Sequence, residues 1–406
     1  MGGVTRPTIA ILGTAGRVRA PERFEPDQLL RVLGANAGNL VFQYAVAQLF
    51  DADTRHIGAA DIPYDDRSAL SGAQCLVVPA ANHLRLGADW TGFCHYLERC
   101  GLPLVVLGLG AQAPAGGERQ TLAALKADPQ VARLAGVIRD RAVFVSVRGP
   151  FSRHVCEAFG IDEPLVLGCP SALLNPDPHL GRAMASQLKT VMHAVRDGDA
   201  PPFALAAAAP FEIAAQADMR DFERVLFAAL GKTGGLYVQQ SGGVDSVLCA
   251  KGPDRRVPER TREAIRSILA PHIAPDAFWQ VLSRHGRFFV SAAQWIAAME
   301  GVAFAVGTRL HGTMAAVAAG RPGIVVTHDS RTGELAQTMR LPTVSLDDVG
   351  RAQGLSDILS AVRFDGAAFD VWRQRTARAL TDALEQIGLP VSAPIHALSG
   401  TGPRHG

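Results

Sequence analysis

Short apolar runs recur along the chain, and each is followed by a glycine-rich or polar turn and then by an amphipathic segment. Residues 8–13, 74–79 and 203–209 are examples of such runs. Apolar runs of about four to eight residues between turn residues are typical of buried parallel strands. The segments 122–135 and 211–230 have the pattern of single helices. This alternation of strand and helix predicts an α/β protein with doubly wound parallel sheets.

The length of 406 residues favours two domains, since a single hydrophobic core rarely grows to that size. A looser stretch, residues 175–202, contains proline and glycine clusters and separates two strand–helix series. We therefore predict an N-terminal Rossmann-like domain over residues 1–178 and a C-terminal one over residues 200–350. Helices over residues 351–393 should pack back onto these domains, and residues 394–406 should form a disordered tail.

The turn G-T-R-L-H-G-T, residues 307–313, lies between an apolar run and an alanine-rich helix pattern. Ligands of open α/β sheets bind outside the carboxyl ends of the strands, where this turn should lie. A helix N-terminus offers free N–H groups there. Arg309 adds a permanent cation suited to carboxylate or phosphate, and His311 adds a group that titrates near neutral pH. Such a pair alone is more often structural, but with the rest of the chain it predicts a small-anion site beside a proton donor or acceptor.

Charge and cysteine usage exclude several classes of function. The net charge of +2, from 40 basic and 38 acidic residues, offers no electrostatic case for nucleic acid as the main partner. The six cysteines form no C-x-x-C pair and no zinc-site spacing with histidine, so we expect reduced thiols and no metal. Neither a signal-peptide pattern nor an apolar run of about 20 residues is present. We therefore expect a cytoplasmic protein.

One motif points to a different chemistry. Residues 241–246 read S-G-G-V-D-S, which matches the pyrophosphate-binding loop of ATP-pyrophosphatases, where glycines let the backbone approach phosphates. In this chain the loop lies mid-sequence, and K-G-P-D-R-R at residues 251–256 should break the following helix within two turns. An ATP-dependent ligase is therefore the less favoured interpretation.

The chain resembles the polysaccharide pyruvyl transferase family through a series of segments in the same order. They are G-A-N-A-G-N-L-V-F-Q-Y-A (34–45), V-V-P-A-A-N (77–82), G-L-G-A-Q (108–112), V-R-G-P-F-S (147–152), G-C-P-S (168–171), G-T-R-L-H-G-T (307–313) and D-S-R-T-G-E-L (329–335). The resemblance implies a GT-B-like fold, with two Rossmann-like domains and a cleft between them. It also implies transfer of a pyruvyl group from phosphoenolpyruvate to two hydroxyls of a sugar in a cell-surface polysaccharide or its precursor, forming a ketal without a further cofactor.

The same resemblance implies roles for particular residues. Arg148, Arg309 and His311 match the catalytic positions, with the two arginines clamping the donor from opposite domains and His311 acting as general acid or as donor to the leaving phosphate. Donor binding extends to Thr308, Gly312, Thr313, Arg331 and Glu334. Glu334 is a base toward a hydroxyl, orients an arginine, or belongs to a structural ion pair at a helix start. The side chains expected to hold acceptor hydroxyls are Asn36, Asn39, Asn82 and Gln112.

Other interpretations stay open at this point. A glycosyltransferase that uses a nucleotide sugar could be built on the same scaffold, because fold does not determine chemistry. A family member without activity could bind glycan only. A lipid-linked acceptor would bring the protein to the inner face of the membrane, and the oligomeric state is undetermined. His83 is expected to be structural.

Overall fold

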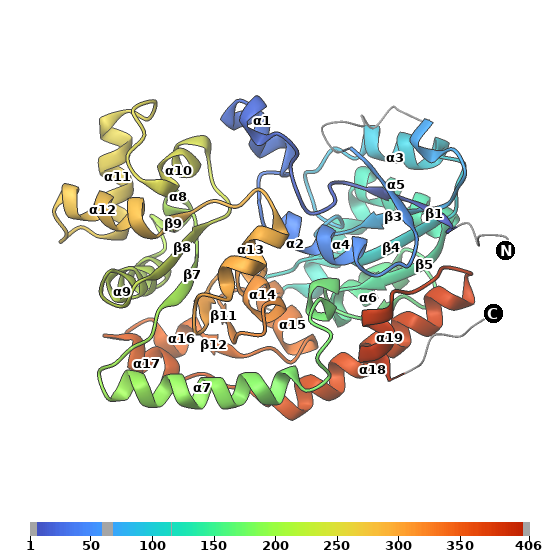
Figure 1. Cartoon of the computed structure of the whole chain (residues 1–406). Helices are drawn as coiled ribbons and strands as arrows, with labels where there is room; N and C mark the ends of the chain where they lie inside the picture. Colours follow the sequence, from blue (N-terminus) through green and yellow to red (C-terminus); the bar gives the residue numbers. More distant parts are fainter. Residues whose placement is uncertain (1–5, 59–67, 115, 401–406) are drawn as a thin grey trace.

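The computed structural model of the chain describes residues 6–58, 68–114 and 116–400, and contains two six-stranded sheets whose strand pairs are parallel (Figure 1). The first sheet has the order β2-β1-β3-β4-β5-β6 and the second the order β12-β11-β10-β7-β8-β9. The α/β class with two Rossmann-like parallel sheets is therefore confirmed. The strands are β1 (Thr8–Leu12), β2 (Asp53–Ile57), β3 (Ala73–Pro79), β4 (Leu104–Leu109), β5 (Ala142–Val147), β6 (Leu165–Val166), β7 (Phe203–Ala207), β8 (Gly235–Gln239), β9 (Gly286–Arg287), β10 (Ala305–Gly307), β11 (Gly323–Thr327) and β12 (Thr343–Ser345).

The first sheet is covered on both faces, which explains why its central strands are apolar along their whole length. Ala10 and Leu12 of β1 pack in the cluster formed with α3 and α5. Ile9 and Ile11 pack on the other face, with α2, α18 (Gly366–Gln386) and α19 (Ala393–Ser399). The helices of this domain are α1 (Pro26–Val32), α2 (Asn39–Ala47), α3 (Thr91–Arg99), α4 (Glu118–Ala127), α5 (Pro129–Arg141) and α6 (Pro150–Ala158).

The second sheet is covered in the same way, but one of its clusters is shared between the domains. Phe203 and Leu205 face the cluster built with α9, α11 and α12. On the other face, Ala204 packs in a cluster with Met314 of α14 and Leu40 of α2. The helices are α8 (Pro210–Ile213), α9 (Ala217–Thr233), α10 (Val244–Leu248), α11 (Glu259–Leu269), α12 (Pro275–His285), α13 (Ala292–Met299), α14 (Leu310–Ala318), α15 (Ser330–Thr338), α16 (Leu346–Val349) and α17 (Leu355–Ser360).

Helices α7 (Leu180–Arg196) and α18 (Gly366–Gln386) run along the lower side of both domains in Figure 1. The buried Asp370 carboxylate of α18 accepts the Gly181 N–H at the start of α7, at 2.5 Å. Arg373, also buried, donates to the Ala172 carbonyl at 2.9 Å. These contacts fix the connection between the domains. Short 3₁₀ turns lie at η1 (Pro21–Arg23), η2 (Ser68–Leu70), η3 (Pro170–Leu173) and η4 (Cys249–Lys251).

The structure corrects three elements of the sequence analysis. The helix expected over residues 122–135 is two helices, because Asp128 caps α5 by accepting the Gln130 N–H at 2.8 Å and Pro129 cannot continue α4. The helix expected over residues 211–230 is divided into α8 and α9, with Gln216 in an extended conformation. Residues 394–399 of the expected disordered tail belong instead to helix α19 (Ala393–Ser399), because Ile395 and Leu398 are buried in the cluster with α18. Residues 401–406 of the expected tail lie outside the described residues.

Candidate active site

The strand order locates a pocket at the edge of the first sheet. The order reverses between β1 and β3, since β2 lies on one side of β1 and the later strands lie on the other. Ligands of open α/β sheets bind outside the carboxyl ends of the strands at such a switch point. A pocket of about 390 Å³ opens there, lined by Leu12 and Gly13 at the end of β1 and by Val78 and Pro79 at the end of β3.

The polar side chains that line this pocket are basic or neutral. Among the described lining residues there is no Asp or Glu, and His311 alone comes from the second domain. A pocket of this composition suits an anion that also carries hydroxyl groups or binds next to them. The basic and amide side chains are those of Arg85, Arg148, His83, His311, Asn36, Asn39, Gln43 and Asn82.

Arg148 is fixed in the pocket wall by backbone carbonyls. It follows β5, and only 7% of its surface is exposed. Its Nε donates to the Gly108 carbonyl at 2.9 Å, and its Nη2 donates to the Ala80 carbonyl at 3.3 Å. Its guanidinium also lies 5.6 Å from the centre of the Phe42 ring. The side chain thus joins the ends of neighbouring strands and holds one positive charge at the pocket.

His311 reaches the same pocket from the first turn of α14. Its ring lies 5.4 Å from that of Phe42, so both Arg148 and His311 contact one aromatic side chain of α2. The His311 Nε2 lies 3.5 Å from the Sγ of the buried Cys169, which accepts a hydrogen bond from Ser171 Oγ at 3.1 Å. The structure therefore brings together two of the three residues expected to be catalytic.

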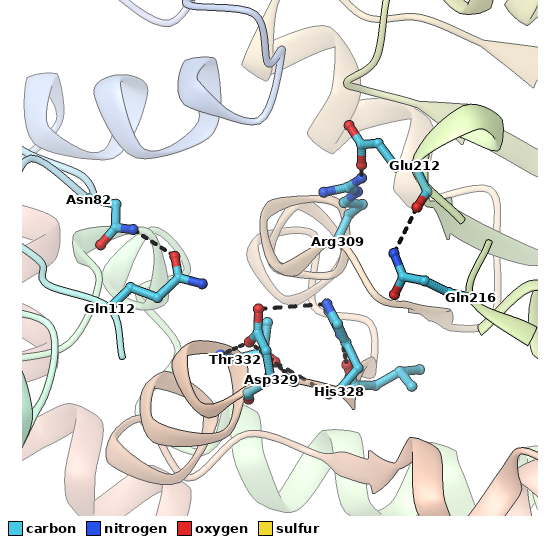
Figure 2. A network of polar contacts seen from close by, with 9 residues as sticks. Asn82, Gln112, Glu212, Gln216, Arg309, His328, Asp329 and Thr332 are labelled. Atoms are coloured by element: carbon cyan, nitrogen blue, oxygen red, sulfur yellow. Dashed lines mark hydrogen bonds and ion pairs between the residues drawn. The ribbon is translucent and has the colours of Figure 1, made fainter. Parts of the chain in front are cut away.

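Arg309, the third, does not line this pocket. It is the N-cap residue of α14, and its guanidinium forms an ion pair with Glu212 of α8 (Figure 2). Successive residues of an α-helix are about 100° apart, so side chains two positions apart lie on roughly opposite sides. His311 accordingly faces the first domain, whereas Arg309 turns toward its own domain.

The remaining residues of the turn shape its backbone. Thr313 is fully buried, and its hydroxyl donates to the Leu310 carbonyl at 2.7 Å. A Cβ on Gly312 would lie 2.6 Å from the Cβ of Ala206, so this position requires glycine to approach β7. Thr308 is buried beside Glu223, whose carboxyl pKa is raised by burial to about 8. None of the three lines the pocket. The side chain of Arg331 lies outside those that the structure describes.

Glu334 contacts the first domain rather than the pocket. Its Oε1 accepts the Phe151 N–H at 2.6 Å, in the first turn of α6. A Cβ on Gly149 would lie 2.4 Å from the same oxygen, so the glycine allows this close approach. Burial raises the pKa of the Glu334 carboxyl, while the hydrogen bonds from the α6 backbone lower it. Glu334 thus caps the helix that begins directly after Arg148 and Gly149.

Three of the four amides expected to bind acceptor line the pocket, and each has protein partners. Asn36 Oδ1 accepts the Gly38 N–H at 2.8 Å and Gln240 Nε2 at 3.1 Å. Asn39 donates to the Leu33 carbonyl at 2.9 Å. Asn82 donates to Gln112 Oε1 at 2.7 Å (Figure 2). Gln112 itself lies outside the lining and holds Asn82 in place.

His83 is a pocket residue that the sequence analysis treated as structural. Its Nδ1 accepts the Ala81 N–H at 2.8 Å, and its ring stacks on Trp90 with a centroid distance of 5.1 Å. Burial is the main reason why the His83 pKa falls to about 4, and the charges of Arg148 and Arg85 lower it further. The ring is therefore neutral near pH 7, and its proton must lie on Nε2. Its position directly after a buried strand was the signal available in the sequence.

Comparison with known families identifies the family of the chain. The family model described as polysaccharide pyruvyl transferase matches residues 26–330. This chain belongs to the polysaccharide pyruvyl transferase family. No curated protein matches the chain. Among solved structures, the crystal structure of Anabaena Alr3699/HepE in complex with UDP and glucose matches with a TM-score of 0.38 and 10% identity, over 93% of this chain and 100% of that chain. A similarity at this level says nothing about the ligands of this chain.

The S-G-G-V-D-S loop of this pyruvyl transferase family member lies at the junction of the two domains. Ser241 forms a β-bridge with Asn36, and the Ala37 N–H donates to the Gln240 carbonyl at 2.7 Å. Helix α10 ends at Leu248, within two turns, as expected from the sequence. The backbone of this loop is thus used for contact with the residue 34–39 loop of the first domain.

Metal ligands, membrane spans and thiols bear on the kind of site. Among the described residues, no group of three or more His, Cys, Asp or Glu side chains is placed to hold a metal ion. In the same part of the chain, no helix is long and apolar enough to cross a membrane. The cysteines are free and buried; they are Cys75, Cys94, Cys100, Cys156, Cys169 and Cys249.

Proposed function

We propose that the chain transfers the pyruvyl group of phosphoenolpyruvate to two hydroxyls of a saccharide, at the pocket that Arg148 and His311 share. In this reaction the methylene carbon takes up a proton, the bond from C2 to the phosphate oxygen breaks, and two sugar oxygens bond to C2. The two hydroxyls release two protons; one balances the proton on the new methyl group, and the other leaves with the phosphate. The product is a pyruvate ketal.

The observation that carries the proposal is the composition of the pocket. It combines two arginines, two histidines and four amides, and no carboxylate lines it among the described residues. Phosphoenolpyruvate carries a carboxylate and a phosphate on three carbons, so it requires a basic pocket of small volume. Membership of the polysaccharide pyruvyl transferase family supports the same reaction.

In this proposal Arg148 binds the negative charge of the donor, and the two histidines take part in proton transfer and hydrogen bonding. Arg148 holds a permanent charge that suits the donor carboxylate, because its side chain is already oriented by Gly108 and Ala80. His311 is the group in the pocket that can carry a proton to the methylene carbon or to the leaving phosphate. His83, neutral and with its proton on Nε2, can donate a hydrogen bond to an oxygen of the reacting groups.

The acceptor is a saccharide in this proposal, held by the amides of Asn36, Asn39 and Asn82. A lipid-linked saccharide would require the pocket to face the membrane from the cytoplasmic side. Leu86, 50% exposed, follows the pocket residue Arg85 directly and would be the first side chain to test for such a contact.

The test is calorimetric binding of phosphoenolpyruvate, ATP and UDP-glucose, followed by phosphate release with a panel of saccharides. We expect binding of phosphoenolpyruvate alone, and phosphate release that depends on a saccharide and is lost in His311→Gln. His95→Gln is the matched control, because His95 is an exposed histidine of α3 outside the pocket. Turnover of UDP-glucose would instead mean that the chain is a glycosyltransferase. ATP binding that disappears in Asp245→Asn would instead mean that the chain is an ATP-dependent ligase.

A further inference from the structure

We propose that Arg85 binds a phosphate group at the mouth of the pocket; given the proposed function, this is the phosphate of phosphoenolpyruvate. Arg85 lies outside the sequence segments that carry the family resemblance, and the sequence analysis gave it no role. The geometry nevertheless places it in the same lining as Arg148 and His311. The inference rests on the proposed function for the identity of the phosphate, but not for its binding.

A backbone carbonyl and stacked aromatic rings hold Arg85 at the rim of the pocket. Arg85 follows β3 in the loop that leads to α3, and its Nη1 donates to the Asn82 carbonyl at 3.3 Å. Its guanidinium lies 5.3 Å from the centre of the Trp90 ring, and Trp90 stacks on His83 at an interplanar angle of 13°. A guanidinium over an aromatic face keeps its charge while losing little freedom on binding. Arg85 is therefore exposed but oriented.

The charge of Arg85 is not neutralised by a carboxylate in the described part of the chain. Its contacts there are a backbone carbonyl and an aromatic ring. By contrast, the partly exposed Arg133 and the exposed Arg153 and Arg256 each pair with an acidic side chain, at 2.9, 2.7 and 2.7 Å. An oriented cation at the rim of a pocket with no described carboxylate is suited to an incoming anion.

The balance between the charges of the pocket and those of the ligand indicates which anion binds there. A phosphate monoester carries about −1.5 to −2 near pH 7, so phosphoenolpyruvate with its carboxylate carries about −2.5 to −3. Arg148 and a protonated His311 supply two positive charges at most, and Arg309 is engaged with Glu212. Arg85 supplies the third. Because Arg148 is buried and Arg85 exposed, the carboxylate belongs inside and the phosphate, the leaving group, at the mouth.

The experiment measures binding of phosphoenolpyruvate and of inorganic phosphate by calorimetry to the full chain and to Arg85→Gln. Glutamine keeps the length that covers Trp90 and removes the charge. Loss of a charge-assisted contact of this kind should weaken both ligands by roughly tenfold to a hundredfold. Arg85→Lys should recover part of the loss. Arg139→Ala is the control, because Arg139 is an exposed arginine paired with Asp140 just before β5 begins, at the opposite edge of the sheet.

Each outcome decides one claim. Unchanged affinity of Arg85→Gln for both ligands, with an unchanged melting temperature, would overturn the assignment of Arg85. If the wild type binds inorganic phosphate through Arg85 but not phosphoenolpyruvate, the anion site stands and the proposed function fails.

Discussion

The contact of Glu334 with the start of α6 leads to a prediction that distinguishes a structural role of this residue, as a helix cap, from a catalytic role as general base. The carboxylate comes from α15 of the second domain and accepts the Phe151 N–H of the first domain at 2.6 Å. If this cap is its role, Glu334→Ala leaves a half-buried N–H group without its acceptor. Glu334→Gln keeps an acceptor oxygen of the same length. If Glu334 is instead a general base, glutamine cannot accept the proton, and the rate falls.

The magnitudes follow from the contact. A hydrogen bond to a charged group contributes about 1.5–3 kcal/mol, and a negative charge at a helix N-terminus about 0.3–1 kcal/mol. Partial exposure of Glu334 reduces both. We expect Glu334→Ala to lower the free energy of unfolding by about 2 kcal/mol, or roughly 4–8 °C in Tm for a domain of 150–250 residues. Glu334→Gln should lose about 1 kcal/mol or less.

The pH dependence of the free energy of unfolding that Glu334 contributes has a definite sign. Burial raises the pKa of Glu334 above its usual value, so the folded chain binds this proton more tightly than the unfolded chain. The stability linked to this proton is therefore full below the unfolded pKa and is lost as pH rises through the folded pKa, whereas the hydrogen bond from Phe151 N–H contributes separately. Glutamine does not titrate, so Glu334→Gln should show a smaller fall in stability over that window.

The assay is thermal unfolding together with the rate of phosphate release. Under the capping interpretation, Glu334→Gln keeps a rate within a few-fold of wild type. A general base would instead cost about 10²–10⁴ in rate. Glu157→Gln is the control, because Glu157 is an exposed glutamate of α6 paired with Arg153. A Glu334→Gln protein with unchanged Tm and donor affinity but no turnover would refute the capping argument.

Three further predictions concern single positions. His311→Gln should reduce phosphate release by about 10²–10⁴, since proton transfer occurs after binding, whereas donor affinity measured by calorimetry should fall by no more than the roughly tenfold to hundredfold expected for loss of one charge. Gly149→Ala should lower Tm by several degrees, because the new Cβ would lie 2.4 Å from the Glu334 carboxylate; an unchanged Tm would mean that the two domains separate easily there. Glu223→Gln should flatten the pH dependence of the free energy of unfolding between about 4.5 and 8. The burial that raises the Glu223 pKa to about 8 makes its contribution fall as pH rises across that range, and equal slopes in urea titrations of both proteins would contradict this.

The two sheets were predictable because their strands are buried on both faces. Continuous apolar runs such as Leu104–Leu109 have few other uses in a globular chain. Strand β2 escaped notice, since Asp53–Ile57 lies at the sheet edge and alternates exposed with less exposed positions. The break between α8 and α9 has no proline or glycine to mark it, so tertiary packing decides it. Helix α19 depends on α18 for its burial and has no independent signal.

Several residues of the candidate site were predictable from the sequence, but the contacts between them were not. The order of the motifs identified Arg148 and His311, and strand ends indicated Asn82. Sequence spacing could not show that Arg309 pairs with Glu212, because the partner is supplied by a different turn of the fold. Nor could it show that Arg85 and His83 share one aromatic residue, Trp90, as a support.

Several of the contacts that join the domains begin next to the pocket. Asn36, which lines it, bonds to Gln240 of the second domain. Glu334 holds the helix that starts two residues after Arg148. The shared apolar cluster includes Leu40 of α2 and Met314 of α14, the helix that carries His311. A shift of one domain against the other would therefore change the distance between Arg148 and His311 directly. Since a displacement of about 1 Å can cost about a hundredfold in rate, substitutions at this junction should affect turnover before they affect folding.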